Sequence, residues 1–276
     1  MRYGTMGRRL LAPFLFLLVF VQCAAALAAA PQITADAAIV VDRGTGAVLY
    51  EKNADKREYP ASMTKMMTCL LAIESGRMDG IVQVSPEAAD VECTRMQPGD
   101  QVRMKDLTEQ MMLISDNGAA TAVGESIGQG DIDYFAELMN RRAESLGMAS
   151  THFVNANGMP DSDHYTTARD MSKLAAAAFE NDTFRSIVGT KEANIYYVRP
   201  AGRVEYCVNT DELLWSYRGI IGGKTGWTNA ARGCLTVAAD RDGRELIAVV
   251  MHSNDDESRF TEAAKLLDYG FAKDSE

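Results

Sequence analysis

Ser62 and Lys65 have a spacing that permits nucleophilic catalysis. They lie three positions apart in Ser-Met-Thr-Lys, shortly after Pro60, which suits a first helical turn. Residues three apart on a helix share a face, so the lysine amine would reach the serine hydroxyl. A lysine can take the proton of that hydroxyl when burial or a nearby cation lowers its pKa. Alone the pattern is weak, because this spacing arises by chance about once in such a chain.

A second group of polar side chains is Ser115-Asp116-Asn117, between two segments of helical pattern. The Ser115 hydroxyl could relay a proton, and the Asn117 amide could bond to the peptide group of a substrate. Loops and helix N-caps, however, favour the same residue types. By itself the tripeptide therefore indicates a helix start.

Lys224-Thr225-Gly226 forms a third group, after two glycines at the end of an apolar run. A lysine and a hydroxyl side by side on an exposed strand can bind a carboxylate, and Gly226 would let a substrate backbone approach closely. A lysine that protects the edge of a sheet from pairing with another chain gives the same pattern. In isolation, both interpretations stay open.

The order of the three groups favours function. SxxK occurs once in the chain and is followed by SDN at the head of a helical pattern and by KTG on a strand pattern. The three together are a known catalytic set of penicillin-binding proteins and class A β-lactamases. The combination predicts an enzyme that acylates its own serine.

The whole sequence resembles the serine D-alanyl-D-alanine carboxypeptidases, the low-molecular-mass penicillin-binding proteins. The likeness covers nearly all of the chain after its first 28 residues and includes AAIVVDRGTGAVLYEKNADKREYPASMTKMMT. Further matching segments are 151–158, 164–171, 219–228 and 265–271.

This resemblance implies a hydrolase that removes D-alanine from peptidoglycan stem peptides ending in D-Ala-D-Ala and is inhibited covalently by β-lactam antibiotics. It implies a role in peptidoglycan biosynthesis, the cell wall and cell shape, with no cofactor and no metal. The oxyanion would be held by the backbone N–H groups of Ser62 and Trp227. The implied catalytic residues are Ser62, Lys65 and Ser115, and the implied substrate-binding residues are Asn117, Lys224, Thr225, Gly226 and Trp227.

Two other functions compete with the carboxypeptidase. A β-lactamase shares the motifs but requires a Glu that activates the deacylating water, four residues before an Asn. The nearest look-alike, Glu137-Leu138-Met139-Asn140, is one residue short and lies in an amphipathic helical pattern. A non-catalytic module that binds peptidoglycan or β-lactams without turnover is the third possibility.

The elements that position these motifs follow from changes in hydrophobic period. Apolar runs at 37–41 and 47–50 flank turn residues and predict a hairpin. Thr167 and Asp170 have capping spacing at the start of an alanine-rich helix. The predicted helices are 62–73, 106–114, 117–127, 133–146, 168–179 and 257–269, and the later strands are 194–198, 203–208, 220–225, 234–239 and 246–251.

Strands at both ends and helices between them predict an α+β fold. The N-terminal hairpin should join the later strands in one antiparallel sheet, flanked by helices and carrying an inserted helical lobe. By the resemblance this is a β-lactamase/transpeptidase-like fold. We expect one catalytic domain, residues 29–276, without the second β domain and C-terminal amphipathic anchor of many relatives.

The first 28 residues have the order of a secretory signal peptide. Three arginines precede an apolar run at 10–21, and an alanine-rich stretch follows. We expect cleavage after Ala28, with a cut after Ala30 or an uncleaved anchor as alternatives. The protein would then be exported and act at the periplasmic or extracellular face of the cytoplasmic membrane.

The negative charge of the chain argues against nucleic acid as a partner. Removal of the signal would take three arginines and no acidic residue, leaving 25 basic and 38 acidic residues and a formal charge of −13. The remaining cysteines have no CxxC spacing and should be mostly buried free thiols. They are Cys69, Cys93, Cys207 and Cys234; the histidines, predicted structural or surface residues rather than metal ligands, are His152, His164 and His252.

Overall fold

The computed structural model describes Met1 and residues 29–273. The expected signal peptide therefore lies, apart from Met1, outside the described residues. Within the described part of the chain, no helix is both long enough and apolar enough to span a bilayer.

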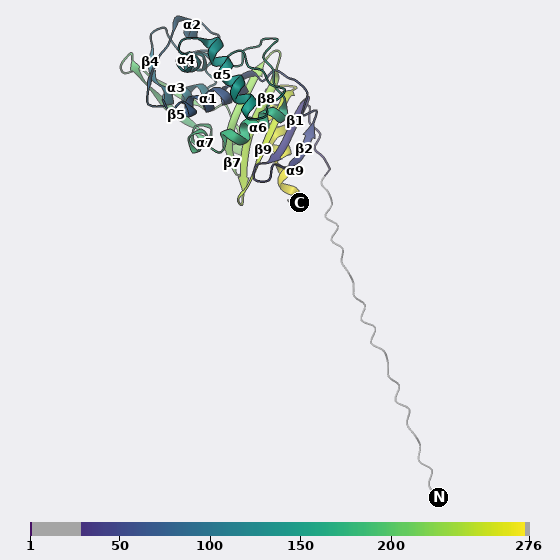
Figure 1. The fold of residues 1–276 in the computed structure, drawn as a ribbon. Coiled ribbons are helices and arrows are strands. Elements are labelled where there is room, and N and C mark those ends of the chain that lie inside the picture. The colour runs from purple at the N-terminus through teal and green to yellow at the C-terminus, as the bar shows by residue number, and fades with distance from the viewer. Residues whose placement is uncertain (2–28, 274–276) are drawn as a thin grey trace.

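A five-stranded antiparallel sheet forms the centre of the structure, in the order β2-β1-β9-β8-β7. The predicted hairpin is its β1–β2 edge, and it pairs with β9 near the other end of the chain (Figure 1). The expectation that the N-terminal hairpin joins later strands is confirmed. The strands are β1 (Ala37–Asp42), β2 (Val48–Lys52), β7 (Ile220–Thr228), β8 (Arg232–Arg241) and β9 (Arg244–Ser253).

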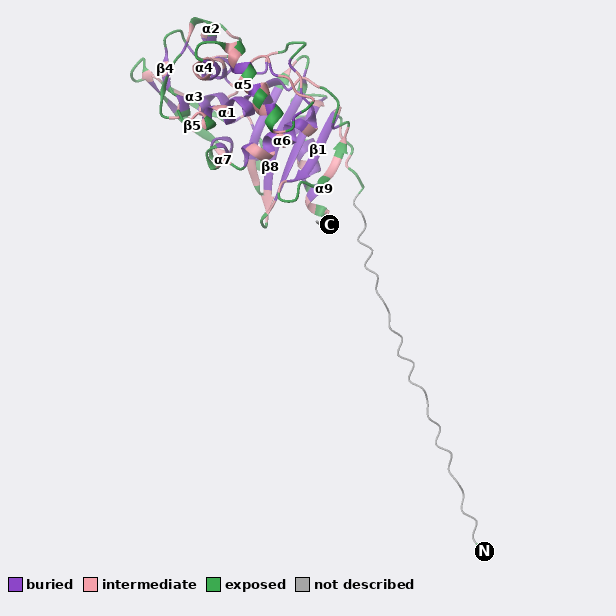
Figure 2. Cartoon of the chain, viewed as in Figure 1, coloured by how far each residue is buried: buried purple, intermediate pink, exposed green. Residues whose placement is uncertain are grey.

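Helices cover both faces of this sheet, which explains why β1 is buried along its whole length. Ile39 faces a large core shared with α6 (Ala168–Ala178) and the helical lobe. Val40 faces the opposite way, towards the closing helix α9 (Ser258–Ala272). Because side chains alternate along a strand, one apolar strand serves two cores. Figure 2 shows these strands largely in the colour of buried residues.

The helical lobe lies to one side of the sheet (Figure 1). Several of its helices begin at a capping side chain: Asp116 accepts from the N–H of Ala119, and Asp131 accepts from two N–H groups of its helix. On the sheet, Thr167 caps α6 as predicted. The lobe helices are α1 (Lys65–Glu74), α2 (Pro86–Ala89), α3 (Met104–Leu113), α4 (Asn117–Ile127), α5 (Ile132–Ser145) and α7 (Asp182–Gly189).

One part of the predicted topology is wrong. The strands expected at 194–198 and 203–208 do not join the main sheet but form a second antiparallel sheet, in the order β3-β4-β5-β6. Their partners β3 and β4 have three residues each, too few to show an alternating pattern. The strands are β3 (Ile81–Gln83), β4 (Gln101–Arg103), β5 (Glu192–Arg199) and β6 (Val204–Val208).

Two local predictions also need correction. The helix expected from Ser62 begins as a 3-10 turn, η1 (Ala61–Thr64), and becomes α-helical only at Lys65. The four described cysteines are free as expected, but Cys93 is exposed while the other three are buried. Cys93 lies in a loop with a positive φ of 56°, where no core surrounds it.

Candidate active site

Ser62 lies where three segments meet. It belongs to the turn η1, and the glycines of two distant segments pack against its backbone nitrogen. A Cβ on Gly226 would come 3.2 Å from that nitrogen, and one on Gly158 would come 3.0 Å from it and 1.9 Å from the Ala61 carbonyl. Side chains at these two positions would push the segments apart, so glycine permits the close approach.

Lys65 is completely buried beside the serine. Its Nζ lies 2.8 Å from Ser62 Oγ, 2.7 Å from Asn117 Oδ1 and 2.6 Å from the backbone oxygen of Asn157. Burial and the positive charge of Lys224 lower the pKa of Lys65 well below its usual value. The predicted contact between Lys65 and Ser62 is thus present, and the lysine environment favours its neutral form.

Of the Ser115-Asp116-Asn117 segment, Asn117 contacts Lys65 and Ser115 does not. Asn117 begins α4, bonds to Lys65 and donates from Nδ2 to the Glu92 carbonyl at 2.9 Å. Ser115 is half-buried with a φ of 61°, a conformation uncommon outside glycine and asparagine. Its hydroxyl makes no hydrogen bond with Ser62 or Lys65 in the described structure.

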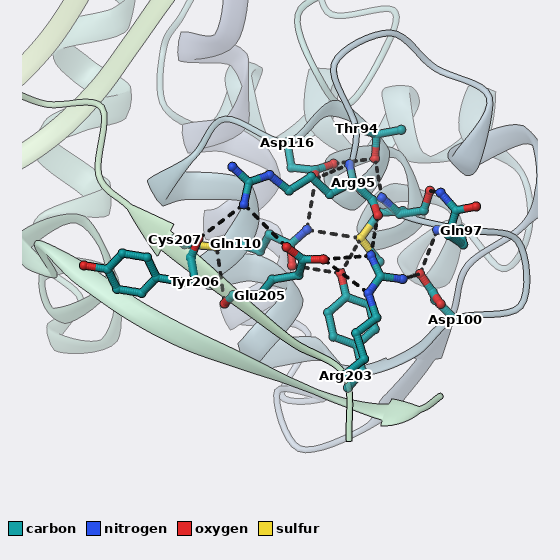
Figure 3. Close-up of polar contacts among 12 residues, drawn as sticks. Thr94, Arg95, Gln97, Asp100, Gln110, Asp116, Arg203, Glu205, Tyr206 and Cys207 are labelled. Carbon is teal, nitrogen blue, oxygen red and sulfur yellow. Dashed lines mark hydrogen bonds and ion pairs between the residues drawn. The ribbon is translucent and has the colours of Figure 1, made fainter. Parts of the chain in front are cut away.

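Asp116, between them, anchors the segment to its surroundings (Figure 3). This buried carboxylate accepts hydrogen bonds from Ala119 N–H at 2.9 Å and from Thr94 Oγ1 at 2.7 Å. It also accepts from Arg95 N–H at 3.0 Å and from Gln110 Nε2 at 2.9 Å. The four donors come from α4, α3 and the loop between α2 and β4, so one side chain fixes the start of α4.

The same network extends to the second sheet (Figure 3). Arg203, just before β6, donates to Asp100 at 2.7 Å and to Glu205 at 3.0 Å. Its guanidinium lies 4.2 Å from the centre of the Tyr197 ring, and the Tyr197 hydroxyl donates to Gln110 Oε1 at 3.1 Å. The second sheet is thereby connected to the Asp116 segment.

Lys224 and Thr225 lie on β7, and both are buried. Lys224 Nζ donates to the carbonyl of Thr225 at 3.0 Å and to its hydroxyl at 3.3 Å. The Thr225 hydroxyl also lies 2.7 Å from that of Thr210, in the segment after β6. Burial and the charge of Arg259 lower the pKa of Lys224 to about 7.

The end of β7 closes the site from the sheet side. Trp227 follows Gly226 and is 40% exposed, with the Arg232 guanidinium 5.7 Å from its ring centre. Arg259 is buried and donates from Nη1 to the Gly226 carbonyl at 3.0 Å. A buried cation from α9 therefore fixes the strand next to Ser62.

His164 supports the other side of the serine turn. Its Nδ1 accepts from the Val154 N–H at 3.1 Å, so its Nε2 carries the proton and donates to Thr64 Oγ1 at 2.8 Å. Burial lowers the pKa of His164 to about 4, which keeps the ring neutral near pH 7. The structural role expected for this histidine agrees with these contacts.

One group of potential metal ligands occurs among the described residues. Asp36, Glu58 and His252 bring ligand atoms within 4.8 Å of one another. Lys56 Nζ already pairs with Asp36 at 3.0 Å and with Glu58 at 2.6 Å. The Lys56 ammonium thus already lies between these carboxylates. None of the three residues hydrogen-bonds to Ser62 or Lys65 in the described structure.

The β-lactamase look-alike has a structural role on α5. Glu137 is exposed and pairs with Arg141 at 3.0 Å, one helical turn along. Asn140 exchanges two hydrogen bonds with the backbone of Phe153, each 2.8 Å long. Neither residue contacts Ser62 or Lys65 in the described structure.

The structure therefore brings most predicted residues together in two groups, Ser62 with Lys65 and Asn117, and Lys224 with Thr225. Sequence reasoning missed several contributors. The Asn157 carbonyl had no signal, because every residue has one. The other two are Arg259 and Thr210. An arginine on an amphipathic helix and a threonine in a loop are common, so only their contacts with Gly226 and Thr225 in the folded chain identify them.

Comparison with known proteins agrees with this geometry. A family model described as D-alanyl-D-alanine carboxypeptidase matches residues 24–255. The D-alanyl-D-alanine carboxypeptidase DacF of Bacillus subtilis is 34% identical, over 87% of this chain and 62% of its own length. The D-alanyl-D-alanine carboxypeptidase of Streptomyces sp. strain K15 is also 34% identical, over 88% of this chain and 89% of its own. The chain thus spans less than two thirds of the Bacillus relative but most of the Streptomyces relative.

The solved structures that match this chain include an enzyme with the same family description. The crystal structure of the Streptomyces K15 DD-transpeptidase matches with a TM-score of 0.84 and 33% identity, over 88% of this chain and 99% of that one. The D-alanyl-D-alanine carboxypeptidase DacD from Francisella tularensis matches with a TM-score of 0.80 and 31% identity, over 88% and 71%. The predicted α+β fold, an antiparallel sheet with an inserted helical lobe, is confirmed.

Proposed function

Because this chain belongs to the D-alanyl-D-alanine carboxypeptidase family, we propose that it is a serine hydrolase that removes the terminal D-alanine from peptidoglycan stem peptides. The observation that carries the proposal is the 2.8 Å contact between Ser62 Oγ and the Nζ of the buried Lys65. A neutral amine at that distance can accept the hydroxyl proton as the serine attacks.

Acylation would proceed as follows. Ser62 Oγ attacks the carbonyl carbon of the penultimate D-alanine, and its proton passes to Lys65. The proton then reaches the leaving D-alanine nitrogen by way of Ser115, while the C–N bond breaks and an ester forms at Ser62. The backbone N–H groups of Ser62 and Trp227 would stabilise the oxyanion. The Ser115 step requires its hydroxyl to turn towards Lys65, which catalytic groups in unliganded sites often do.

Substrate binding would use the remaining predicted residues. Lys224 and Thr225 would hold the terminal carboxylate by charge-assisted hydrogen bonds. The Asn117 amide would bond to the peptide backbone, and Gly226 would let that backbone approach β7. The burial of Lys224 and the 2.7 Å contact between Thr225 and Thr210 support a polar site that is shaped in advance.

Penicillins would acylate the same serine, and the resulting ester should be long-lived. The remnant of a β-lactam ring stays tethered where the departing D-alanine would leave room for water. Rapid hydrolysis would then need a separate carboxylate base, as in the β-lactamase pattern. The exposed position of Glu137 supports the carboxypeptidase over the β-lactamase.

Transfer of the acyl group to an amine is a second candidate function. The observation that favours it is the match to a structure titled as a DD-transpeptidase. Hydrolysis gives a peptide with a free carboxylate, whereas transfer gives a peptide joined to the amine. Product analysis by mass spectrometry with and without glycylglycine separates the two, and we expect the free acid to dominate.

The proposed location follows from the substrate. Peptidoglycan lies outside the cytoplasmic membrane, so we propose that residues 1–28 export the protein and that 29–276 act as the catalytic domain at the periplasmic or extracellular membrane face. Roles in the cell wall and in cell shape belong to the same proposal. Detection of a mature N-terminus after Ala28 by N-terminal sequencing would support it, and an intact leader on protein found only in the cytoplasm would contradict it.

The function is tested by incubating the protein with diacyl-Lys-D-Ala-D-Ala and measuring free D-alanine. We expect release by the wild type and none by Ser62→Ala, which should also lose covalent labelling by fluorescent penicillin. A binding module would show no release in the wild type and would keep its affinity for the peptide in the variant. Labelling retained in Ser62→Ala would remove Ser62 from the mechanism.

A further inference from the structure

Asp211 is a buried carboxylate that the mechanism above does not use. Its side chain is 0% exposed, in the segment between β6 and α8 (Leu213–Ser216). Its Oδ1 accepts from the Leu213 N–H at 3.1 Å, and its own N–H donates to Asn209 Oδ1 at 2.9 Å. Its Oδ2 has no hydrogen-bond partner among the described residues. A buried carboxylate oxygen without a partner is costly, so its retention indicates a task.

The segment that carries Asp211 lies directly beside the strand that carries Lys224. The hydroxyls of Thr210 and Thr225, the residues next to each, are 2.7 Å apart. Lys224 is 1% exposed, and its ammonium donates to Thr225 alone in the described structure. A buried anion and a buried cation thus come from two neighbouring segments.

Arg259 adds a second buried cation, from α9. It is 5% exposed and bonds to the carbonyl of Gly226, two residues after Lys224. Arg259 and burial lower the pKa of Lys224, whereas the charge of Asp211 raises it. Burial raises the pKa of Asp211 to about 6, while the Leu213 N–H and the two cations oppose this. The three charges therefore act on one another across three segments.

We propose that Asp211 is a positioning residue whose buried negative charge keeps Lys224 protonated for the substrate carboxylate. The inference rests on the proposed function, because that function gives Lys224 its task. With Asp211 ionised, the set of Asp211, Lys224 and Arg259 carries one net positive charge. It becomes neutral when the carboxylate of the substrate binds. Without Asp211, the charge of the buried Arg259 would act on Lys224 unopposed, and Lys224 would lose its proton more readily.

The other charged or titratable groups that act on these residues come from four segments. Glu212 follows Asp211 and is exposed, Asp256 pairs with Arg259 and is 61% exposed, and the Cys234 thiol on β8 is buried. Lys65, on α1, feels the charge of Lys224. Of the three carboxylates, Asp211 alone is fully buried, so solvent screens its charge least.

The test is the pH dependence of kcat/KM for diacyl-Lys-D-Ala-D-Ala in the wild type and in Asp211→Asn, which keeps the shape and removes the charge. In both proteins kcat/KM should fall at high pH, as Lys224 loses its proton; we call this fall the alkaline limb. In the variant the limb should lie about one pH unit lower. At pH 8.5 the kcat/KM of the variant should therefore be about tenfold below that of the wild type, mainly because KM rises. Glu212→Gln, a matched change of charge at the exposed neighbour, should leave the limb within about 0.2 units.

A second pair of variants separates charge from shape. A guanidinium does not lose its proton in this range, so Lys224→Arg alone should abolish the alkaline limb. In that background Asp211→Asn should no longer move the profile. If kcat/KM of Lys224→Arg still falls at high pH, the fall does not come from Lys224 and the inference is overturned. This result does not depend on whether Asp211→Asn folds. The inference is equally overturned if Asp211→Asn leaves the limb of the wild type in place.

Failure of the proposed function gives a different result. In that case the wild type releases no D-alanine at any pH. The same profile is then measured as the rate of acylation by fluorescent penicillin, which also presents a carboxylate. If the acylation rate of Asp211→Asn falls at a lower pH than that of the wild type, the charge effect on Lys224 is supported. If both rates fall at the same pH, it is contradicted.

Discussion

At the scale of single residues, environment rather than residue type decides the chemistry. Two lysines, Lys65 and Lys224, are both buried, and burial lowers the pKa of each. Lys65 contacts Ser62, the proposed nucleophile, while Lys224 lies beside a threonine hydroxyl on β7. In the proposed mechanism a lowered pKa suits Lys65 as a base, whereas it opposes the protonated form that Lys224 needs in order to bind a carboxylate.

The role of Lys224 predicts a selective loss. Charge-assisted hydrogen bonds to a carboxylate contribute roughly 1.5–3 kcal/mol. Lys224→Ala should therefore lower kcat/KM on the peptide by about one to two powers of ten, at roughly 1.4 kcal/mol for each. Steady-state kinetics with the acid and the C-terminally amidated peptide measure this directly. If the variant still prefers the acid as strongly as the wild type does, Lys224 does not bind the carboxylate.

At the scale of secondary-structure elements, buried polar side chains hold the catalytic segments in place. Asp116 accepts four hydrogen bonds at the start of α4, which carries Asn117. Asp116→Ala should cost roughly 2–4 kcal/mol of unfolding free energy, because buried donors lose their acceptor. It should also slow penicillin acylation by at least about tenfold, since Asn117 would lose its position relative to Lys65.

Asp131→Ala is the matched control for this prediction. Asp131 caps α5 through two N–H groups but is exposed and makes no hydrogen bond with Lys65. Its loss should cost about 1 kcal/mol in urea unfolding and leave acylation unchanged. Equal acylation rates in wild type and Asp116→Ala would show that the cap is structural only.

His164 predicts a pH dependence of stability. Its pKa in the folded protein, about 4, lies below the usual value near 6.5, so folding favours the neutral ring. This contribution is fully present above pH 6.5 and is lost as the pH falls towards 4. Between pH 7 and pH 5 the loss is roughly 2 kcal/mol of unfolding free energy.

His164→Gln tests this, because Gln does not titrate and can still donate to Thr64. Urea unfolding at pH 5 and pH 7 should show a smaller fall in stability for the variant than for the wild type. Other groups titrate in both proteins, so the difference between them isolates His164. An equal fall in both would mean that His164 is not buried in its neutral form.

At the scale of the whole molecule, the sequence predicted the elements with strong local signals. α4 begins at Asn117 because Asp116 caps it, and β1 is visible as an apolar run between turn residues. The second sheet was missed because β3 and β4 are too short for a pattern. α7 was missed because eight residues with three buried apolar side chains resemble a loop.

In the site, too, some residues could be recognised from their type and others only from their position in the fold. The motif residues Ser62, Lys65 and Lys224 were predictable, because their chemistry depends on their side chains. The Asn157 carbonyl and the buried Asp211 were not, because their roles depend on tertiary contacts that bring separate segments together. Ser115 was predicted from its motif, yet its hydroxyl has no contact with Ser62 or Lys65 in the described structure.

The most direct test of a serine acyl-enzyme is intact-protein mass spectrometry after incubation with benzylpenicillin. We expect one added drug mass, located on the peptide that contains Ser62 and absent from Ser62→Ala. The adduct should persist for minutes or longer, because no carboxylate base contacts Ser62 or Lys65 in the described part of the chain. No adduct at Ser62, or its loss within seconds with multiple turnovers of penicillin, would contradict the account.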